Sequence, residues 1–362
     1  MGKHICFLMP AVGYAPSGGF KVVFEYANRF VNDDFQVSIV FPAVHFYNTL
    51  SRKKKVKAII RYLLNFSPRR YTPYSWFNLD KRVKLFPVWD LSESNIPAAD
   101  IYIATAVQTA VYLNEYKKIT SHQKFYFIQG FETWALPEKK VLETYTYPLQ
   151  KITIAPWLMD KIESAGGKAD LIYNGFDFKY FKKEIDYKDK NRYCITMLYH
   201  PMPEKGCKDA FEALSIVKNK FSNLQVNLFG FPKQPPDLPN WINYYQQPDK
   251  KTHNRLYNEA AIFINASHGE GFCLTPPEAM QCGCAIACTD IGGFKVVCHH
   301  EKTALLSPVK DPVALASNIE RLITDNLLRY KLAENGHKYI QQFTWEKAYS
   351  KFKDLIDIST KV

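Results

Sequence analysis

The stretch AAIFINASHGEGFCLTPPEAMQCG (residues 260–283) places two glutamates eight residues apart, with a Gly-Phe after the first and a Pro-Pro before the second. Its first eight residues are apolar and bounded by polar ones, which is typical of a buried strand. Glu270 therefore falls in the loop at the carboxyl end of that strand. Pro276 and Pro277 suit the first turn of a helix, where a missing N–H costs nothing, so we expect Glu278 in that turn.

A strand–loop–helix unit of this kind is where open α/β sheets bind ligands, because the helix N-terminus presents free N–H groups and a partial positive charge. A sugar nucleotide has groups that suit each part of such a unit. The alternative is that Glu278 only offsets the helix dipole and that Glu270 is a solvated loop acid. The rest of the chain has to decide between the two interpretations.

The composition favours a folded protein of two domains. At 362 residues the chain exceeds one typical core. Its 47% hydrophobic and 15% aromatic residues can fill two cores and argue against disorder. The net charge of +12 favours anionic partners such as phosphates, anionic lipid surfaces or nucleic acid, without choosing among them.

The cysteines and the apolar runs indicate a cytoplasmic protein. Cys282, Cys284 and Cys288 surround an apolar segment without a CxxC pair, so we expect buried, reduced thiols and no zinc site. The N-terminal run KHICFLMPAVG lacks the cleavage site of a signal peptide, and no apolar segment reaches the length of a transmembrane helix.

Apolar runs alternate with helical patterns in both halves of the chain. In the first half, strands are expected in ICFLMPAV and FQVSIVFP and at residues 100–106, 124–130 and 151–156. The alternation restarts with YCITMLY and continues through LQVNLFG, AAIFINAS and CAIACTD. This βα alternation predicts a doubly wound parallel sheet in each half.

The fold class expected is therefore α/β, with two Rossmann-like doubly wound domains. Residues 177–192 are strongly charged and lack an apolar period, which is typical of a linker. This places an N-terminal, acceptor-side domain at residues 1–176 and a C-terminal, nucleotide-sugar-binding domain at residues 193–345. Residues 346–362 are expected to form a helix that packs back on the N-terminal domain.

The residues from Glu270 to Gly293, together with EKTALLSPVKDPVALASNIERLI (301–323), resemble the donor-binding region of family 4 retaining glycosyltransferases. The signature of that family is a Glu, seven residues and a second Glu, a spacing that Glu270 and Glu278 match. The resemblance covers most of the C-terminal half, and in the N-terminal half it is limited to the loop SGGF and the strand order. It implies the GT-B architecture, in which two Rossmann-like domains face a cleft.

The resemblance also implies roles for single residues. Glu278 would hold the ribose hydroxyls of the nucleotide, and Glu270 would face the donor sugar. Lys205, in the motif EKG, would neutralise the diphosphate as it leaves, although it can also be read as an exposed loop lysine. Glu270 and Lys205 are thus the expected catalytic residues. The other expected donor contacts are Gly18, Gly19, His200, Tyr245, Gln247, Gly271, Phe272, Cys273 and Leu274.

The chain departs from the family pattern at several places, including Cys273 where a small residue is usual and Ala304 where a Gly is usual. The family usually carries an Arg five or six residues before the diphosphate Lys, and Tyr199 and His200 stand there instead. The histidine common in the N-terminal domain is not evident. Gln129 and Glu132, in FIQGFETW, occupy about its place and are candidates for the sugar or acceptor side, with structural roles as the alternative.

No DxD-type carboxylate pair follows a strand, so we expect neither a metal clamp on the diphosphate nor another cofactor. Nucleic acid is not an expected partner, because no basic motif with interleaved stacking aromatics belongs to a known module.

Residues 51–70, SRKKKVKAIIRYLLNFSPRR, have the pattern of a basic amphipathic helix. The apolar positions at helical spacing are Val56, Ile59, Ile60, Leu63 and Leu64, and the basic positions, which fall mainly on the other side, are Lys53, Lys54, Lys57 and Arg61. Such a helix binds anionic membranes, although an ordinary surface helix packed on its sheet has the same pattern.

Together these observations predict a retaining glycosyltransferase that moves a sugar from a nucleotide-diphosphate sugar to a glycan or glycolipid acceptor, in the cytoplasm and at the inner face of the membrane. The alternative is a protein that binds a nucleotide sugar without turnover.

Overall fold

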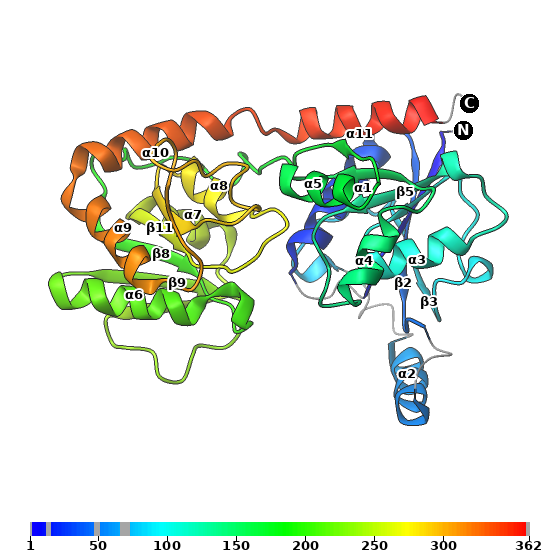
Figure 1. Ribbon diagram of the computed structural model, residues 1–362, viewed down its shortest axis with the longest axis horizontal. Coiled ribbons are helices and arrows are strands. Elements are labelled where there is room, and N and C mark those ends of the chain that lie inside the picture. The colour runs from blue at the N-terminus through cyan, green and yellow to red at the C-terminus, as the bar shows by residue number, and fades with distance from the viewer. Residues whose placement is uncertain (1, 12–15, 47–50, 66–72, 360–362) are drawn as a thin grey trace. The chain divides into compact units, whose positions relative to one another are not determined.

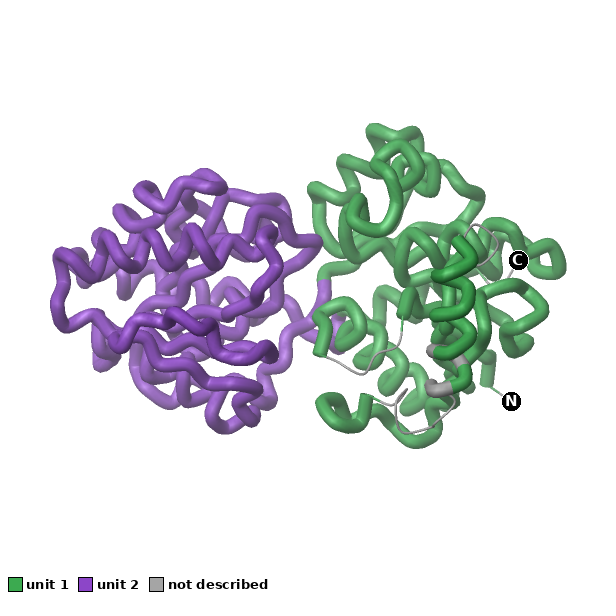
Figure 2. The backbone as a smooth tube through the Cα atoms, turned by 90° about the horizontal axis from the view of Figure 1, so that it is seen from below, with its two compact units in different colours: residues 1–173, 348–362 green, residues 174–347 purple. Residues whose placement is uncertain are grey.

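The computed structural model describes residues 2–11, 16–46, 51–65 and 73–359 (Figure 1). The chain divides into two compact units (Figure 2). Unit 1 comprises Met1–Tyr173 and Ala348–Val362, and unit 2 comprises Asn174–Lys347. Each unit contains one parallel sheet, so the prediction of two Rossmann-like α/β domains is confirmed.

The sheet of unit 1 has the strand order β3-β2-β1-β4-β5-β6-β7, and every pair in it is parallel. Its strands are β1 (His4–Leu8), β2 (Gln36–Pro42), β3 (Lys84–Val88), β4 (Ile101–Ala104), β5 (Lys124–Ile128), β6 (Gln150–Thr153) and β7 (Asp170–Leu171). The central strands are nearly continuous apolar runs that are buried along their length, as expected when helices cover both faces of a parallel sheet.

The helices of unit 1 are α1 (Gly18–Asn32), α2 (Arg52–Asn65), α3 (Val107–Glu115), α4 (Glu138–Thr144) and α5 (Pro156–Ser164), with short 3₁₀ helices at Pro73–Ser75, Glu93–Asn95 and Ser121–Gln123. The helix α11 (Trp345–Ser359) adds residues from Ala348 onward to this unit. Its Phe352 is fully buried, with ring centroids 4.7 Å from Tyr26 and 5.5 Å from Phe127.

The sheet of unit 2 has the order β10-β9-β8-β11-β12-β13 and is also parallel throughout. Its strands are β8 (Asn191–Leu198), β9 (Gln225–Gly230), β10 (Ile242–Gln246), β11 (Ala260–Asn265), β12 (Ala285–Thr289) and β13 (Leu305–Ser307). Its helices are α6 (Cys207–Lys220), α7 (Lys250–Glu259), α8 (Thr275–Gln281), α9 (Pro312–Thr324) and α10 (Asn326–Ile340), with a 3₁₀ turn at Pro203–Lys205.

The strand order of unit 2 identifies the edge at which a ligand fits. The chain runs outward from β8 to β9 and β10, then crosses back to β11 on the other side of β8. Neighbouring loops that leave the carboxyl ends of β8 and β11 therefore turn to opposite faces of the sheet. This topological switch point is where open α/β sheets bind ligands.

Residues 177–192, which the sequence predicts as a linker, lie within unit 2 and are held there by side-chain amides of α7. The backbone N–H groups of Lys182 and Glu184 donate to Asn254 Oδ1 (2.9 Å) and Asn258 Oδ1 (2.7 Å). These contacts use the backbone of the segment, and the buried side chain of Lys190 adds hydrogen bonds from its Nζ to Tyr257 O (2.8 Å) and Cys282 O (2.7 Å). A pattern search for apolar side chains therefore misses the packing.

Candidate functional site

The loops at the carboxyl ends of β8 and β11 bring together the two residues predicted to be catalytic. Lys205 ends the 3₁₀ turn after β8, and Glu270 lies in the loop after β11. The Nζ atom of Lys205 lies 2.7 Å from Glu270 Oε1, and the hydroxyl of Ser267 donates to the same oxygen at 2.9 Å. The Lys205 and Glu270 side chains are 30% and 15% exposed, so this ion pair is largely sheltered but reachable from solvent.

Gly206 makes this contact possible, because it lets the two loops approach at backbone distance. Its φ of +62° is in the left-handed region, and a Cβ at this position would lie 1.9 Å from the carbonyl oxygen of Ala266. Two contacts nearby join the loop after β11 to the turn after β8 and to α6: His268 N–H donates to Glu204 O (2.8 Å), and His268 Nε2 lies 2.6 Å from Asp209 Oδ2.

The backbone around Glu270 is fixed by residues that sequence analysis missed. Asn265 Oδ1 accepts a hydrogen bond from the N–H of Ser267 (3.0 Å) and lies 2.9 Å from the Ser267 hydroxyl, whose single proton it shares with Glu270 Oε1. A Cβ on Gly293 would lie 2.4 Å from the carbonyl oxygen of Glu270, so glycine is required there as well. The only sequence signals for these contacts are polar residues at a strand end and a Gly-Gly pair, which are too common to be specific.

Glu278 lies in the first turn of α8, as the sequence predicts. The residue is 8% exposed, and the hydroxyl of Tyr257 on α7 lies 3.4 Å from its Oε2. A carboxylate at a helix start is stabilised by the helix dipole. It is therefore preorganised to accept hydrogen bonds.

The segment Gly271–Leu274 joins Glu270 to α8 and is anchored by its side chains. The Phe272 ring stacks on Phe176, with centroids 5.7 Å apart. Cys273 is buried, its Sγ lies 3.4 Å from Thr275 Oγ1, and burial raises the pKa of its thiol. All eight cysteines of the chain are buried and free, as expected from the sequence.

Of the two residues that stand in the place of the usual arginine, His200 is the one that faces Lys205. Burial lowers the pKa of His200, and the Lys205 charge lowers it further. Its Nδ1 accepts from Met202 N–H at 3.2 Å, which leaves the proton of the neutral ring on Nε2. Tyr199 instead stacks on Phe211 at a centroid distance of 6.2 Å and packs against the unit 2 core.

Tyr245 and Gln247 lie at the carboxyl end of β10, on the same edge of the sheet. Gln247 Nε2 donates to Phe231 O at 3.2 Å, and the Tyr245 ring lies 5.8 Å from the Arg255 guanidinium. Since β10 is three strand positions from β11, these residues are about 14 Å away across the sheet. The structure does not bring them into contact with the Lys205–Glu270 pair.

The remaining predicted residues belong to unit 1 and lie at the carboxyl edge of its sheet. Gly18 and Gly19 open α1, and Gln129 Nε2 donates to Gly19 O at 3.3 Å. Glu132 Oε2 accepts from Val107 N–H, the first residue of α3, at 2.5 Å. Burial raises the pKa of Glu132 to about 7, although the Val107 bond opposes this shift.

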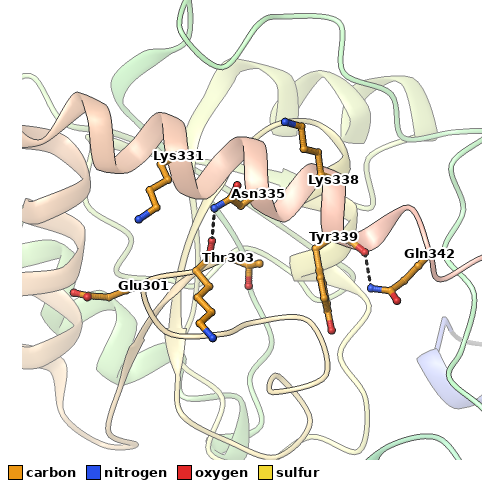
Figure 3. A pocket seen from close by; sticks show the side chains of 8 residues that line it. Glu301, Thr303, Lys331, Asn335, Lys338, Tyr339 and Gln342 are labelled. Atoms are coloured by element: carbon orange, nitrogen blue, oxygen red, sulfur yellow. Dashed lines mark hydrogen bonds between the residues drawn. The ribbon is translucent and has the colours of Figure 1, made fainter.

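Two further observations concern ions and hollows. In the described ranges, no group of three or more His, Cys, Asp or Glu side chains could hold a metal ion. A hollow of about 590 Å³ lies beside α10 in unit 2, where Lys331, Asn335 and Tyr339 approach the turn that carries Glu301 and Thr303 (Figure 3). None of the predicted site residues lines it.

Comparison of the sequence with known proteins points to glycosyltransferases. Residues 179–339 match the family model described as "Glycosyl transferases group 1". A D-inositol 3-phosphate glycosyltransferase of Salinispora tropica is 31% identical over 28% of this chain and 21% of its own length. A phosphatidyl-myo-inositol mannosyltransferase of Mycolicibacterium smegmatis is 24% identical over 51% of this chain and 50% of its own length. The chain thus spans about a fifth to a half of the length of these relatives.

Comparison of the structure with solved structures covers nearly the whole chain. The HepE protein of Anabaena, solved in complex with UDP-glucose, is 16% identical, with 98% of this chain and 99% of that chain covered and a TM-score of 0.72. Sucrose-phosphate synthase of Thermosynechococcus elongatus is also 16% identical, with 98% of both chains covered and a TM-score of 0.69. The fold is therefore that of the GT-B glycosyltransferases, and residues 179–339 match glycosyl transferases group 1.

Proposed function

We propose that this protein is a retaining glycosyltransferase that moves a sugar from a nucleotide-diphosphate sugar to a glycan or glycolipid acceptor. The observation that carries the proposal is the cluster at the switch point of unit 2. There a lysine ammonium and a carboxylate in contact with it lie on the loops after β8 and β11, and a second, sheltered carboxylate lies in the first turn of α8, in the Glu-x7-Glu spacing.

Each group has a task that suits its chemistry. An ammonium has three donors, so Lys205 can bind a departing diphosphate while it keeps its contact with Glu270. Negative charge develops on that diphosphate in the transition state, where a fixed cation stabilises it most. Glu270 accepts hydrogen bonds from the donor sugar, and Glu278 accepts them from the ribose hydroxyls.

His200 supplies a neutral donor where the resembled family has an arginine. With Nδ1 occupied by Met202, its Nε2–H can donate to a phosphate oxygen without adding a charge. Lys205 is then the main cation on the diphosphate, and we propose that no metal is needed. Activity is expected to survive excess EDTA, and its loss on chelation would overturn this part.

The described part of α2 supports the proposal that the enzyme works at an anionic membrane. Val56, Ile59, Ile60 and Leu63 are 41% to 67% exposed, so the apolar face of this helix is not covered by the sheet. The side chain of Leu64 and residues 66–70 of the predicted helix lie outside what the structure describes. Charged lysines beside an uncovered apolar face are typical of helices that lie in a lipid interface.

A donor panel tests the main proposal. UDP-glucose, UDP-N-acetylglucosamine, GDP-mannose and ADP-glucose are compared for thermal stabilisation, since a ligand that binds the folded state raises its stability by mass action. Slow hydrolysis of the bound donor is followed by NMR, which also shows the configuration of the released sugar. Binding without hydrolysis or transfer would favour a nucleotide-sugar-binding protein, and release of the inverted anomer would exclude a retaining enzyme.

A further inference from the structure

Trp134 is the exposed member of the six tryptophans in the chain. It is 74% exposed, whereas the other five are buried or half-buried. An indole combines a large apolar face with an N–H donor, which suits it to contact with a ligand or partner.

Hydrogen bonds and packed neighbours fix the turn that carries the exposed Trp134. Within the segment between β5 and α4, Ala135 N–H donates to Glu132 O at 3.0 Å. Glu132 itself is fastened to α3 by the bond from Val107. Phe131, Ala135 and Leu136, on either side, pack against the core of unit 1. The turn is thus held by its neighbours while the indole is directed outward.

A groove beside α5 adds polar groups to this surface. A hollow of about 390 Å³ is lined by Trp157, Asp160, Lys161 and Ser164 of α5, with Leu142 of α4 and Ala165. The four α5 residues have the spacing of one helix face. The hollow is connected to the turn through Lys161, whose Nζ lies 4.9 Å from the centre of the Phe131 ring.

The chemistry of this surface suits a carbohydrate. The C–H face of a pyranose ring is apolar and carries partial positive charge, so it stacks on the electron-rich face of an indole. Its hydroxyl groups need acceptors and donors, which Asp160, Ser164 and Lys161 offer along the groove. The volume lies within the roughly 300–1,000 Å³ of ordinary ligand pockets.

We propose that unit 1 binds an oligosaccharide acceptor along this surface, with one sugar stacked on Trp134 and a further sugar in the α5 groove. The inference rests on the proposed glycosyltransferase function and specifies its acceptor as a glycan of several residues. All the groups involved belong to unit 1.

The test measures binding of glucose against maltohexaose, mannose against mannohexaose and N-acetylglucosamine against chitohexaose, by titration calorimetry. At least one hexasaccharide is expected to bind ten or more times as tightly as its monosaccharide. Trp134→Ala is expected to weaken that binding at least tenfold, whereas Trp134→Phe, which keeps a flat ring, weakens it less than about threefold. Asp160→Asn also weakens it, and Tyr74→Ala, at an exposed aromatic residue elsewhere in unit 1, leaves it unchanged.

Three outcomes would overturn the inference. The first is that no hexasaccharide binds more tightly than its monosaccharide, and the second is that the wild type and Trp134→Ala bind the hexasaccharide equally. The third is that Trp134→Ala loses binding to phosphatidylglycerol vesicles but keeps glycan binding. The last would make Trp134 a membrane anchor. The melting temperature of each variant shows that it is folded. Donor hydrolysis by the wild type is measured separately, so a failure of the proposed function is distinguished from a failure of the acceptor surface.

Discussion

The Lys205–Glu270 pair is the residue contact on which the proposed chemistry depends. The two side chains are 30% and 15% exposed, and the pair spans 2.7 Å between the loops after β8 and β11. Because the Nζ charge is most useful when the diphosphate leaves, Lys205→Ala is expected to lower kcat by roughly 100-fold and to change KM less. Steady-state kinetics with the best donor of the panel measures both.

The matched control for this substitution is Lys208→Ala, which removes an exposed lysine three residues away on α6. It should keep wild-type kinetics. An effect of Lys205→Ala that is confined to KM would mean that the lysine binds substrate and transition state equally well.

Glu132 gives a second prediction at this scale, because its raised pKa couples stability to pH. The folded carboxyl has a pKa of about 7, above its ordinary value of 4.5, so the unfolded state ionises first as pH rises. The free energy of unfolding should therefore fall between about pH 4.5 and 7 and stay level above that range. Glu132→Gln should remove this contribution, as urea unfolding at pH 5 and 7.5 would show.

Glu138→Gln, at an exposed position in the first turn of α4, is the control for this experiment. If it changes the pH dependence of unfolding as much as Glu132→Gln does, the contribution does not come from burial of Glu132.

At the scale of elements, Gly206 joins the loops after β8 and β11. Alanine there would need an unfavourable φ of +62° and would place its Cβ against the Ala266 carbonyl, so Gly206→Ala should destabilise the protein by more than about 1 kcal/mol and impair nucleotide binding. Gly269→Ala is a close control, since a Cβ at Gly269 would meet nothing within 4 Å. Equal behaviour of the two variants in urea unfolding and nucleotide titration would contradict this account.

The helix α2 carries the membrane prediction. Each lysine near an anionic surface contributes about 1 kcal/mol, and the attraction decays within a Debye length. Changing Lys53, Lys54, Lys55 and Lys57 to Gln should therefore release the protein from anionic vesicles in a sedimentation assay, as raised salt should.

The same change at four exposed lysines of unit 2 controls for total charge. The control positions are Lys208, Lys251, Lys302 and Lys310. Retention of the α2 variant on vesicles, or release of the control variant to the same extent, would show that α2 is only a surface helix.

Comparison of elements shows what sequence patterns can predict. The central strands β1, β5, β8 and β11 are long apolar runs, and sequence analysis finds them. It misses the edge strands β3, which contains Pro87, β7, β10 and β13, because edge strands need fewer apolar residues and tolerate proline.

The residues of the candidate site likewise divide into those that a local sequence pattern predicts and those that it does not. Glu270 and Glu278 were identified from their spacing in one continuous stretch. The approach of Gly206 to Ala266, and of Gly293 to Glu270, depends on residues far apart in the sequence, and no local pattern records it.

For the whole molecule, α11 is the element that connects the end of unit 2 to the core of unit 1. The Phe352 ring lies between Tyr26, Phe30 and Phe127, and Lys353 Nζ lies 2.7 Å from Asp33 Oδ2. Phe352→Ala should cost unit 1 about 3–5 kcal/mol, the usual effect of removing a buried phenylalanine. Hydrogen exchange resolved by peptide should show lost protection in β1 and β5 and little change in β8 and β11.

Lys351→Ala, at an exposed position one residue before Phe352, should leave exchange unchanged throughout. Equal loss of protection in both units after Phe352→Ala would show that they unfold together.

The division of unit 1 into two segments also sets an order of events on the ribosome. Unit 2 is continuous from Asn174 to Lys347, so all of it is translated before Ala348 and the rest of α11 are made. At about 5–20 residues per second, its synthesis takes on the order of 10–35 s. During that time Phe352 is not yet present to pack against the aromatic rings of Tyr26, Phe30 and Phe127, and we expect chaperones that bind emerging chains to recognise this uncovered surface.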